Sequence, residues 1–333
     1  MTDNAIVVEG LAKRFGEVVA LDGIDFQVPA GSVFGLLGPN GAGKTTAIRI
    51  LTTIIRPDGG RAEVLGLDVV READEVRYRI GLAGQYAAID PNLTGRENLR
   101  LTGRLAQLPT ADARTRADEL LERFQLSDAG DRPARTYSGG MRRRLDVAAA
   151  LVQRPPVVFL DEPTTGLDIH SRNALWEMIR ELVAEGTTVL LTTQYLEEAD
   201  RLAHRVAVVD GGRVIANDTP AALKAQLGST VIELGMGDAD RAGRAGELLT
   251  QRLDAQPERD GATVRLTSDD GSRLLIDVLR LLDDQDLAPA TLAVRDPSMD
   301  DVFLALTGHR AEAETAANGA RRGRRGARAR GAA

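Results

Sequence analysis

The sequence predicts an α/β protein with two domains. Three short apolar runs suit strands that are buried on both faces, namely 33–37, 157–160 and 187–193. A glycine-rich stretch separates the first run from a helical pattern, as in a strand–loop–helix unit. At 333 residues the chain is too long for one typical domain, and its 43% hydrophobic and 27% charged content is that of an ordinary globular protein.

Composition excludes several classes of protein. The chain has no cysteine, so disulfides and cysteine metal sites are excluded, and its three histidines make a histidine metal centre improbable. We expect no membrane span and no signal peptide, because the apolar runs are far shorter than the ~20 residues that cross a bilayer. Any work at a membrane must then go through a partner.

Charge is distributed unevenly along the chain. The formal net charge is −7, although residues 320–333 hold six arginines and no acid. The remainder is therefore strongly acidic, and we expect no nucleic acid partner. We interpret 310–333 as a disordered, Arg-rich tail, and favour a solvated tail over an anchor for anionic lipid or nucleic acid.

The first 31 residues predict two short strands, 5–9 and 24–28, with turn residues at 13–16 between them. Phe15 precedes the glycine-rich stretch by about 25 residues. It could stack on an adenine ring, since base stacking on an aromatic side chain contributes ~1 to 3 kcal/mol. A core position for Phe15 is an equal alternative.

The glycine-rich stretch matches the phosphate-binding pattern G-x-x-x-x-G-K-[ST]. Its members are Gly38, Pro39, Asn40, Gly41, Ala42, Gly43, Lys44, Thr45 and Thr46. We expect the three glycines to adopt positive φ, so that backbone N–H groups point at phosphate oxygens, and a helix to begin near Gly43. Lys44 is predicted to bind the β- and γ-phosphates and Thr45 to ligate Mg²⁺.

Beyond the loop helix, a short strand 80–85 ends in Gln85, a side chain placed to reach the metal and the attacking water. The strand pattern then stops, and 91–154 predicts a helical insertion that opens with the capping box Thr94-x-x-Glu97. Its last helix begins at Ser138, followed by two glycines. A serine and glycines at a helix N-terminus predict a second anion site, this time without a lysine.

Two carboxylates, Asp161 and Glu162, follow the buried run 157–160 directly. Burying adjacent acids without a task would be costly. Asp161 is predicted to hold Mg²⁺, and Glu162 to act as general base or to polarise the water that attacks the γ-phosphate.

The segments after the carboxylates complete the predicted domain. A tight turn and a helix over 172–185 follow, then the strand that ends before Gln194, a hairpin over 206–216 and a helix starting at Pro220.

Together these motifs resemble the nucleotide-binding subunit of an ATP-binding cassette (ABC) transporter, over residues 5 to about 227. The resemblance makes Gln85 the glutamine loop, 137–141 the family signature and 166–168 the loop after the carboxylates. It implies that two subunits dimerise on ATP, so that Ser138, Gly139 and Gly140 of one cover the ATP bound by Lys44 of the other. It further implies ATP and Mg²⁺ as cofactors, an integral-membrane permease as partner, and a place on the cytoplasmic face of the cell membrane.

The chain departs from the family pattern at two positions. The signature ends in Met141 where Gln is usual, which affects the family's most variable position. Gln194 stands where the family has a switch histidine. A glutamine amide can donate a hydrogen bond to the γ-phosphate but cannot become cationic. We therefore expect hydrolysis to persist, with Glu162 as the main catalytic residue and Gln194 assisting.

Within that family, the segments 137–146, 192–200 and 299–309 look like the ATPase subunits of daunorubicin and doxorubicin resistance exporters. This likeness implies a subunit that powers the efflux of hydrophobic drugs through a separate membrane protein. The substrate itself does not follow from the sequence, because its contacts belong to the partner.

We assign 1–229 to the ATPase domain and 230–309 to a small α+β domain with three strands and three helices. The second domain has no glycine loop or cluster of titratable residues, so we expect a regulatory or docking role there.

Two functions other than a transporter subunit stay open for the whole chain. One is a soluble cassette ATPase that acts on DNA or ribosomes. The other is a regulator gated by nucleotide, not coupled to transport.

Overall fold

The computed structural model describes residues 4–84, 89–228, 230–253, 256–268 and 270–306. It divides into two compact units, Met1–Thr219 and Pro220–Ala333. Helix α8 (Pro220–Ala225) groups with the second unit, whereas the domain boundary expected from the sequence lies after it, at residue 229.

A six-stranded sheet forms the centre of the first unit within its described residues, in the order β10-β9-β3-β8-β7-β6. The strands are β3 (Val33–Leu37), β6 (Ile80–Ala83), β7 (Val157–Asp161), β8 (Thr188–Thr193), β9 (Arg205–Asp210) and β10 (Arg213–Asp218). All pair in parallel except β10, which forms the predicted antiparallel hairpin with β9. Every residue of β3, β7 and β8 is buried, which explains their continuous apolar character.

A second sheet, β2-β1-β4-β5, is built on a long hairpin. Its strands are β1 (Asn4–Phe15), β2 (Val18–Pro29), β4 (Gly59–Val64) and β5 (Leu67–Asp68). The prediction of two strands separated by a turn is confirmed, but both strands are longer than predicted, and the turn lies at Gly16 and Glu17 because β1 continues to Phe15. Gly10 and Gly23 adopt positive φ near register shifts between β1 and β2, so the strands bend and continue past them.

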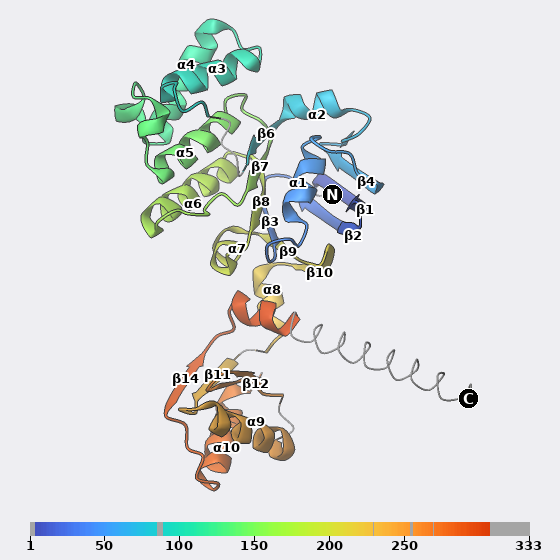
Figure 1. Cartoon of the computed structure of the whole chain (residues 1–333), viewed down its shortest axis with the longest axis vertical. Helices are drawn as coiled ribbons and strands as arrows, with labels where there is room; N and C mark the ends of the chain where they lie inside the picture. The colour runs from blue at the N-terminus through green and yellow to red at the C-terminus, as the bar shows by residue number, and fades with distance from the viewer. Residues whose placement is uncertain (1–3, 85–88, 229, 254–255, 269, 307–333) are drawn as a thin grey trace, which may run out of the picture. The chain divides into compact units, whose positions relative to one another are not determined.

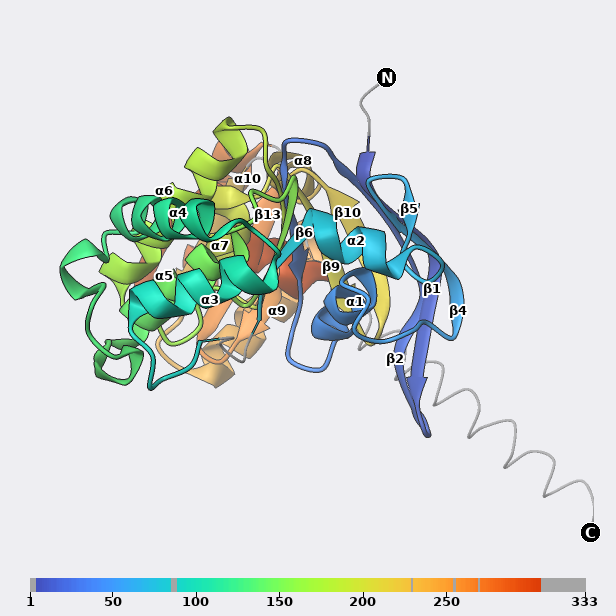
Figure 2. The same ribbon diagram turned by 90° about the horizontal axis from the view of Figure 1, so that it is seen from above.

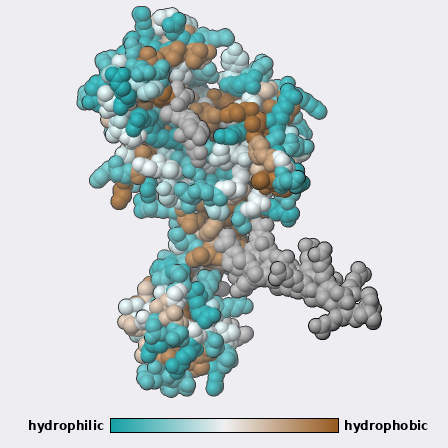
Figure 3. All heavy atoms as spheres, in the orientation of Figure 1, coloured by the Kyte–Doolittle hydropathy of each residue, from teal (hydrophilic) through white to brown (hydrophobic). Residues whose placement is uncertain are grey.

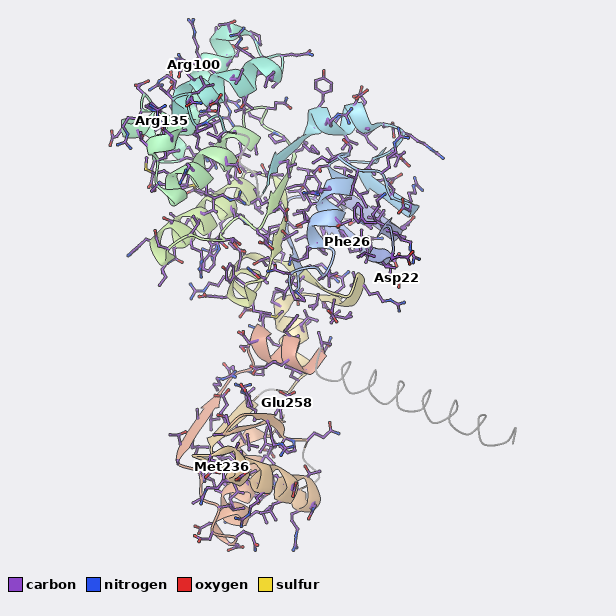
Figure 4. The ribbon with its side chains drawn as sticks, in the orientation of Figure 1. Asp22, Phe26, Arg100, Arg135, Met236 and Glu258 are labelled. Atoms are coloured by element: carbon purple, nitrogen blue, oxygen red, sulfur yellow. The ribbon has the colours of Figure 1, made fainter. Side chains whose placement is uncertain are left out.

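Helices cover both faces of the central sheet (Figure 1). Helices α1 (Lys44–Leu51) and α2 (Ala73–Arg79) lie on the side of the second sheet, whereas α5 (Gly139–Ala150), α6 (Ile169–Ala184) and α7 (Leu196–Leu202) lie on the opposite side (Figures 1 and 2). The core between the two sheets includes Phe26 and Phe34, whose stacked rings have centroids 5.2 Å apart. Figure 4 shows Phe26 beside α1.

The helical insertion forms where strand patterns are missing from the sequence. It contains α3 (Gly95–Leu105), α4 (Thr110–Arg123), two short 3₁₀ turns, η1 (Ser127–Ala129) and η2 (Ala134–Thr136), and then α5. The predicted capping box is confirmed, since the backbone N–H of Glu97 donates to Thr94 Oγ1 at 3.1 Å and that of Thr94 donates to Glu97 Oε2 at 2.8 Å. The apolar stripe of α4 is buried, as its helical spacing predicts.

The second unit is a small α+β fold. Its described strands form the antiparallel sheet β12-β13-β11-β14: β11 (Thr230–Gly235), β12 (Glu258–Asp260), β13 (Thr263–Ser268) and β14 (Thr291–Arg295). Helices α9 (Ala239–Leu253) and α10 (Gly271–Asp283) pack on it around buried Leu234 and Met236, the latter labelled in Figure 4. The alternation predicted from the sequence is present, and β12 escaped prediction because its three residues are polar and exposed.

The visible face of the first unit is largely hydrophilic, with apolar residues in separate patches (Figure 3). Within the described residues, none of the helices combines the length and the apolar character needed to cross a bilayer.

Candidate functional site

The phosphate-binding loop connects the end of β3 to the start of α1. Gly41 and Gly43 adopt positive φ, 84° and 107°, as predicted, and Gly43 is the N-cap of α1. Gly38 does not, so the prediction of positive φ there is wrong. Glycine is required at 38 for another reason, since a Cβ would lie 2.1 Å from the carbonyl oxygen of Val209 in β9.

Lys44 opens α1 and is buried, with its side chain 4% exposed. Its ammonium donates to the carbonyls of Gly38 at 2.8 Å and Pro39 at 3.0 Å, and lies 3.7 Å from Glu162 Oε1. Burial lowers the pKa of Lys44, while the carboxylates of Glu162 and Asp161 oppose that shift. The loop thus holds a cation at the end of the sheet, beside the predicted general base.

Asp161 ends β7, next to β8 in the sheet. Its Oδ1 accepts hydrogen bonds from Thr45 Oγ1 at 3.1 Å and from Thr192 Oγ1 at 2.6 Å. The hydroxyl and the carboxylate predicted to hold Mg²⁺ are therefore adjacent, although 116 residues separate them in the chain. Oxygen ligands of this kind are those that Mg²⁺ prefers.

Glu162 adopts a left-handed backbone conformation with φ 48°. A non-glycine residue in this region costs about 1–3 kcal/mol and persists where its surroundings fix it. Its N–H donates to Thr192 Oγ1 at 2.9 Å and to the Thr192 carbonyl at 3.2 Å, and its Oε2 accepts from Thr165 Oγ1 at 3.3 Å. In this conformation Oε1 of the carboxylate lies 3.7 Å from the ammonium of Lys44.

Gln194 follows the last residue of β8 and is half-buried. Thr193 pairs with Leu37 of β3, and its carbonyl accepts from the N–H of Gly38 at 3.3 Å. Gln194 therefore emerges next to the first residue of the phosphate-binding loop. Gln85, the other glutamine predicted at the site, lies outside the described residues.

The signature residues form the N-terminus of α5. The hydroxyl of Ser138 caps the helix by accepting from the N–H of Met141 at 3.2 Å. A Cβ at Gly140 would lie 2.5 Å from the Ser171 hydroxyl of α6, whereas a Cβ at Gly139 would meet nothing within 4 Å. Helix α5 lies on the opposite side of the sheet from α1 (Figure 1). The serine that caps α5 and the lysine that opens α1 therefore belong to helices on different faces of the sheet.

A cleft of about 530 Å³ lies between the start of α5 and the segment after β7. Gly139, Arg142, Glu162 and Gly166 are among the residues that line it. Glu162 thus borders both this cleft and Lys44 of the phosphate-binding loop.

Phe15 is 49% exposed at the end of β1, so the alternative of a core position is wrong. The ammonium of Lys13 lies 5.6 Å from its ring centroid. One face of an exposed aromatic ring remains suited to stacking on a purine, and the adenine contact stays a prediction.

Sequence reasoning missed two residues that hold the site together. Thr192 bonds to both Asp161 and Glu162, and only the parallel register of β7 and β8 puts it there. Arg143 donates to the backbone on both sides of Glu162, at Asp161 and Pro163. The run of three arginines, 142–144, at a helix start was the available signal for Arg143.

Known proteins share both the motifs and the fold. The family model described as ABC transporter matches residues 21–165. The chain is 55% identical to a daunorubicin resistance ATP-binding protein of Streptomyces coeruleorubidus, over 94% of this chain and 98% of that protein. It is 47% identical to a doxorubicin resistance ATP-binding protein of Mycobacterium tuberculosis, over 92% and 94%, and 42% identical to a Nod factor export ATP-binding protein of Ralstonia nicotianae, over 90% and 93%.

Solved structures agree with these relatives. The ATP-binding subunit of an ABC transporter superposes with a TM-score of 0.61 at 28% identity, covering 67% of this chain and 92% of that one. A bacterial ABC transporter cassette solved as a dimer gives 0.59 at 25% identity, covering 64% and 98%. The predicted fold class and the family resemblance are both confirmed.

The two kinds of glycine in the loop predict different costs of substitution. Gly38→Ala should lower the free energy of unfolding by about 2–3 kcal/mol, because the new methyl group would overlap a strand carbonyl that cannot move alone. Gly41→Ala has open space and should cost only about 1 kcal/mol from its positive φ. Urea unfolding of both variants tests this, and an equal or reversed order would contradict the packing role of Gly38.

Proposed function

The chain belongs to the ABC transporter family, and from that premise we propose that it is the ATP-hydrolysing subunit of an exporter that moves hydrophobic drugs through a separate membrane subunit. The observation that carries the proposal is the meeting of Lys44, Asp161 and Glu162 at one edge of the sheet. Relatives named for daunorubicin and doxorubicin resistance support the type of cargo.

ATP binding follows from the loop. Backbone N–H groups after Gly41, the start of α1 and the Lys44 ammonium provide positive charge for the phosphates. Phe15 offers a ring face for the adenine, on the exposed end of β1. An incoming triphosphate would compete with the carbonyls of Gly38 and Pro39 for the Lys44 ammonium.

The residues present fit a magnesium ion bound together with ATP. Thr45 and Asp161 would hold it, with Gln85 as a further ligand that the sequence predicts. Among the described residues, no group of three or more histidine, cysteine or acidic side chains could hold a metal ion by itself. Phosphate oxygens and water would supply the remaining ligands. Bound there, Mg²⁺ neutralises the charge that develops on the phosphates.

We assign to Glu162 the removal of a proton from the attacking water, because its carboxylate lies 3.7 Å from the ammonium of Lys44, the residue proposed to bind the γ-phosphate. Gln194 leaves β8 next to Gly38 and could donate a hydrogen bond to the same phosphate. Because a glutamine amide neither takes up a proton nor becomes cationic near neutral pH, we assign Gln194 the assisting role and Glu162 the main one.

A complete site requires a second copy of the chain. Ser138, Gly139 and Gly140 form an anion-binding helix start on the side of the sheet away from α1, so in our proposal they reach the ATP of a partner chain. The open space around Gly139 suits close approach of a phosphate. The relative that was solved as a dimer supports this arrangement.

The membrane partner and the second unit complete the proposal. An integral-membrane permease would carry the drug and place this chain at the cytoplasmic face of the cell membrane.

The second unit would have a docking or regulatory role. There Arg295 bonds to Glu233 at 2.8 Å and to Asp301 at 2.7 and 2.9 Å, tying the helical residues 299–306 to the sheet.

Glu162→Gln should lower ATP turnover by ~10²- to 10⁴-fold while ATP binding persists, because the amide cannot accept the proton of water. Gln194→Ala should retain measurable turnover. Phosphate release and nucleotide-binding assays on both variants check this. Wild-type turnover in Glu162→Gln together with a complete loss in Gln194→Ala would reverse the two assignments. A wild-type chain that binds ATP without turnover would instead be a nucleotide-gated regulator.

Mixing two inactive variants tests the shared site. Lys44→Ala and Ser138→Arg should each abolish turnover alone, whereas an equal mixture should regain roughly a quarter of wild-type activity. Half of the randomly formed dimers are mixed, and each has one intact site of two. Phosphate release by the mixture is the readout. A mixture as inactive as its components would indicate that each chain completes its own site.

Drug export is tested by expressing the chain with its membrane subunit in a drug-sensitive bacterium. We expect increased resistance to daunorubicin and doxorubicin and lower drug accumulation in the cell. Glu162→Gln at equal expression should remove both effects, because transport needs hydrolysis. Resistance that survives this substitution would contradict a motor role, and unchanged sensitivity with active wild-type protein would exclude these drugs as cargo.

A further inference from the structure

Arg143 lies one turn into helix α5 and points away from solvent, with its side chain 13% exposed. Its Nε donates to the carbonyl of Pro163 at 2.8 Å, Nη2 to that of Asp161 at 2.8 Å and Nη1 to that of Gly84 at 2.6 Å. Nη1 also donates to Asp146 Oδ2 at 3.0 Å, which neutralises the buried charge. One guanidinium therefore joins the signature helix to the ends of two strands, β6 and β7.

Two of these carbonyls flank Glu162. The residue has φ 48°, so the peptide groups on its two sides turn away from the direction of the strand. Thr192 holds the N–H of Glu162 from the side of β8, and Arg143 holds the carbonyls of Asp161 and Pro163 from the side of α5. The left-handed conformation is thus fixed from both sides.

We propose that Arg143 is a positioning residue for the general base, holding the main chain of Glu162 so that its carboxylate faces the phosphate-binding loop. The inference rests on the proposed function, in which Glu162 takes the proton of the attacking water. It also links the two halves of the site. Arg143 lies on the helix whose start carries Ser138, so a shift of the signature helix is transmitted to the base of its own chain.

The chemistry of the contact requires arginine. A guanidinium is planar and carries five N–H donors, so it can bond to three carbonyls that lie in different directions. A lysine ammonium has one nitrogen and cannot reach all three. Burial lowers the pKa of Arg143, whereas Asp146 and Asp161 oppose the shift.

The neighbouring Arg144 offers a matched control. It lies on the same helix and donates to a main-chain carbonyl, that of Phe124 at the end of α4, at 3.1 Å. Its described bonds connect α5 to the helical insertion and leave the backbone of Glu162 untouched. Arg144→Lys removes a comparable guanidinium contact without the proposed effect on the base.

The experiment compares ATP hydrolysis by the full chain carrying Arg143→Lys or Arg144→Lys. Arg143→Lys should lower kcat by roughly 10- to 100-fold and leave KM for ATP within about threefold, because a displaced base slows chemistry while the binding loop is intact. Arg144→Lys should keep wild-type kcat. Equal kcat in the wild type and Arg143→Lys, or a rise in KM alone, would overturn the proposal.

A second comparison separates positioning from a merely structural role. In the Glu162→Gln background, Arg143→Lys should reduce the residual turnover by less than about twofold, since the group that it positions is already lost. A further loss as large as in the wild-type background would overturn the proposal. If Arg143→Lys gives no cooperative unfolding transition, Arg143→Gln replaces it. An amide keeps donors for part of the contact, so kcat should fall by about threefold or more with KM unchanged, and wild-type kcat would overturn the proposal.

Measurements on the wild-type chain separate a failure of the proposed function from a failure of the proposed role of Arg143. Wild-type protein that does not hydrolyse ATP would contradict the proposed function. Hydrolysis that is unaffected by Arg143→Lys would contradict only the role of Arg143.

Discussion

The hydroxyl of Thr192 joins the two adjacent acidic residues of the site, and their arrangement depends on this contact. This side chain is fully buried at the end of β8, between the phosphate-binding strand β3 and the carboxylate strand β7. It donates to Asp161 at 2.6 Å and accepts from the N–H of Glu162 at 2.9 Å. One buried hydroxyl, with its donor and its acceptor both satisfied, therefore joins the Asp161 carboxylate to the main chain of Glu162. The parallel register of β7 and β8 sets Thr192 opposite Asp161.

Electrostatics explains why the Lys44 ammonium and the Glu162 carboxylate lie together. Lys44 is buried, and its pKa is lowered by burial, so the ammonium needs acceptors and a counter-charge nearby. Loop carbonyls and Glu162 supply them. In the proposed function, a γ-phosphate would offer a stronger counter-charge to the same ammonium, so the binding of ATP would free the Glu162 carboxylate to face water.

The sequence predicted those parts of the site that consecutive residues specify. A short run of consecutive residues was enough to predict the loop, the capped helix at Ser138 and the pair Asp161–Glu162. The strands of the parallel core could also be predicted locally, because they are wholly apolar. What it could not predict depends on contacts between distant segments. Gly38 is a glycine because of Val209, more than 160 residues away, and Phe15 is exposed because β1 extends past Gly10. Short polar elements such as β12, with no apolar alternation, also gave no signal.

The role of Arg143 also could not be predicted from consecutive residues, because it depends on contacts with distant segments. Three successive arginines look like a solvated, basic helix start, and the side chains of Arg142 and Arg143 differ only in the direction that the helix gives them. Arg142 is exposed in the cleft, whereas Arg143 faces the sheet and meets the bent backbone around Glu162. A strained residue needs neighbours that fix it, and this one is fixed by a helix whose start we assign to the partner's ATP. In that arrangement, the position of Glu162 in one chain would depend on how the signature helix α5 of the same chain contacts the other chain. The two ATP sites of a dimer would then be coupled directly through α5.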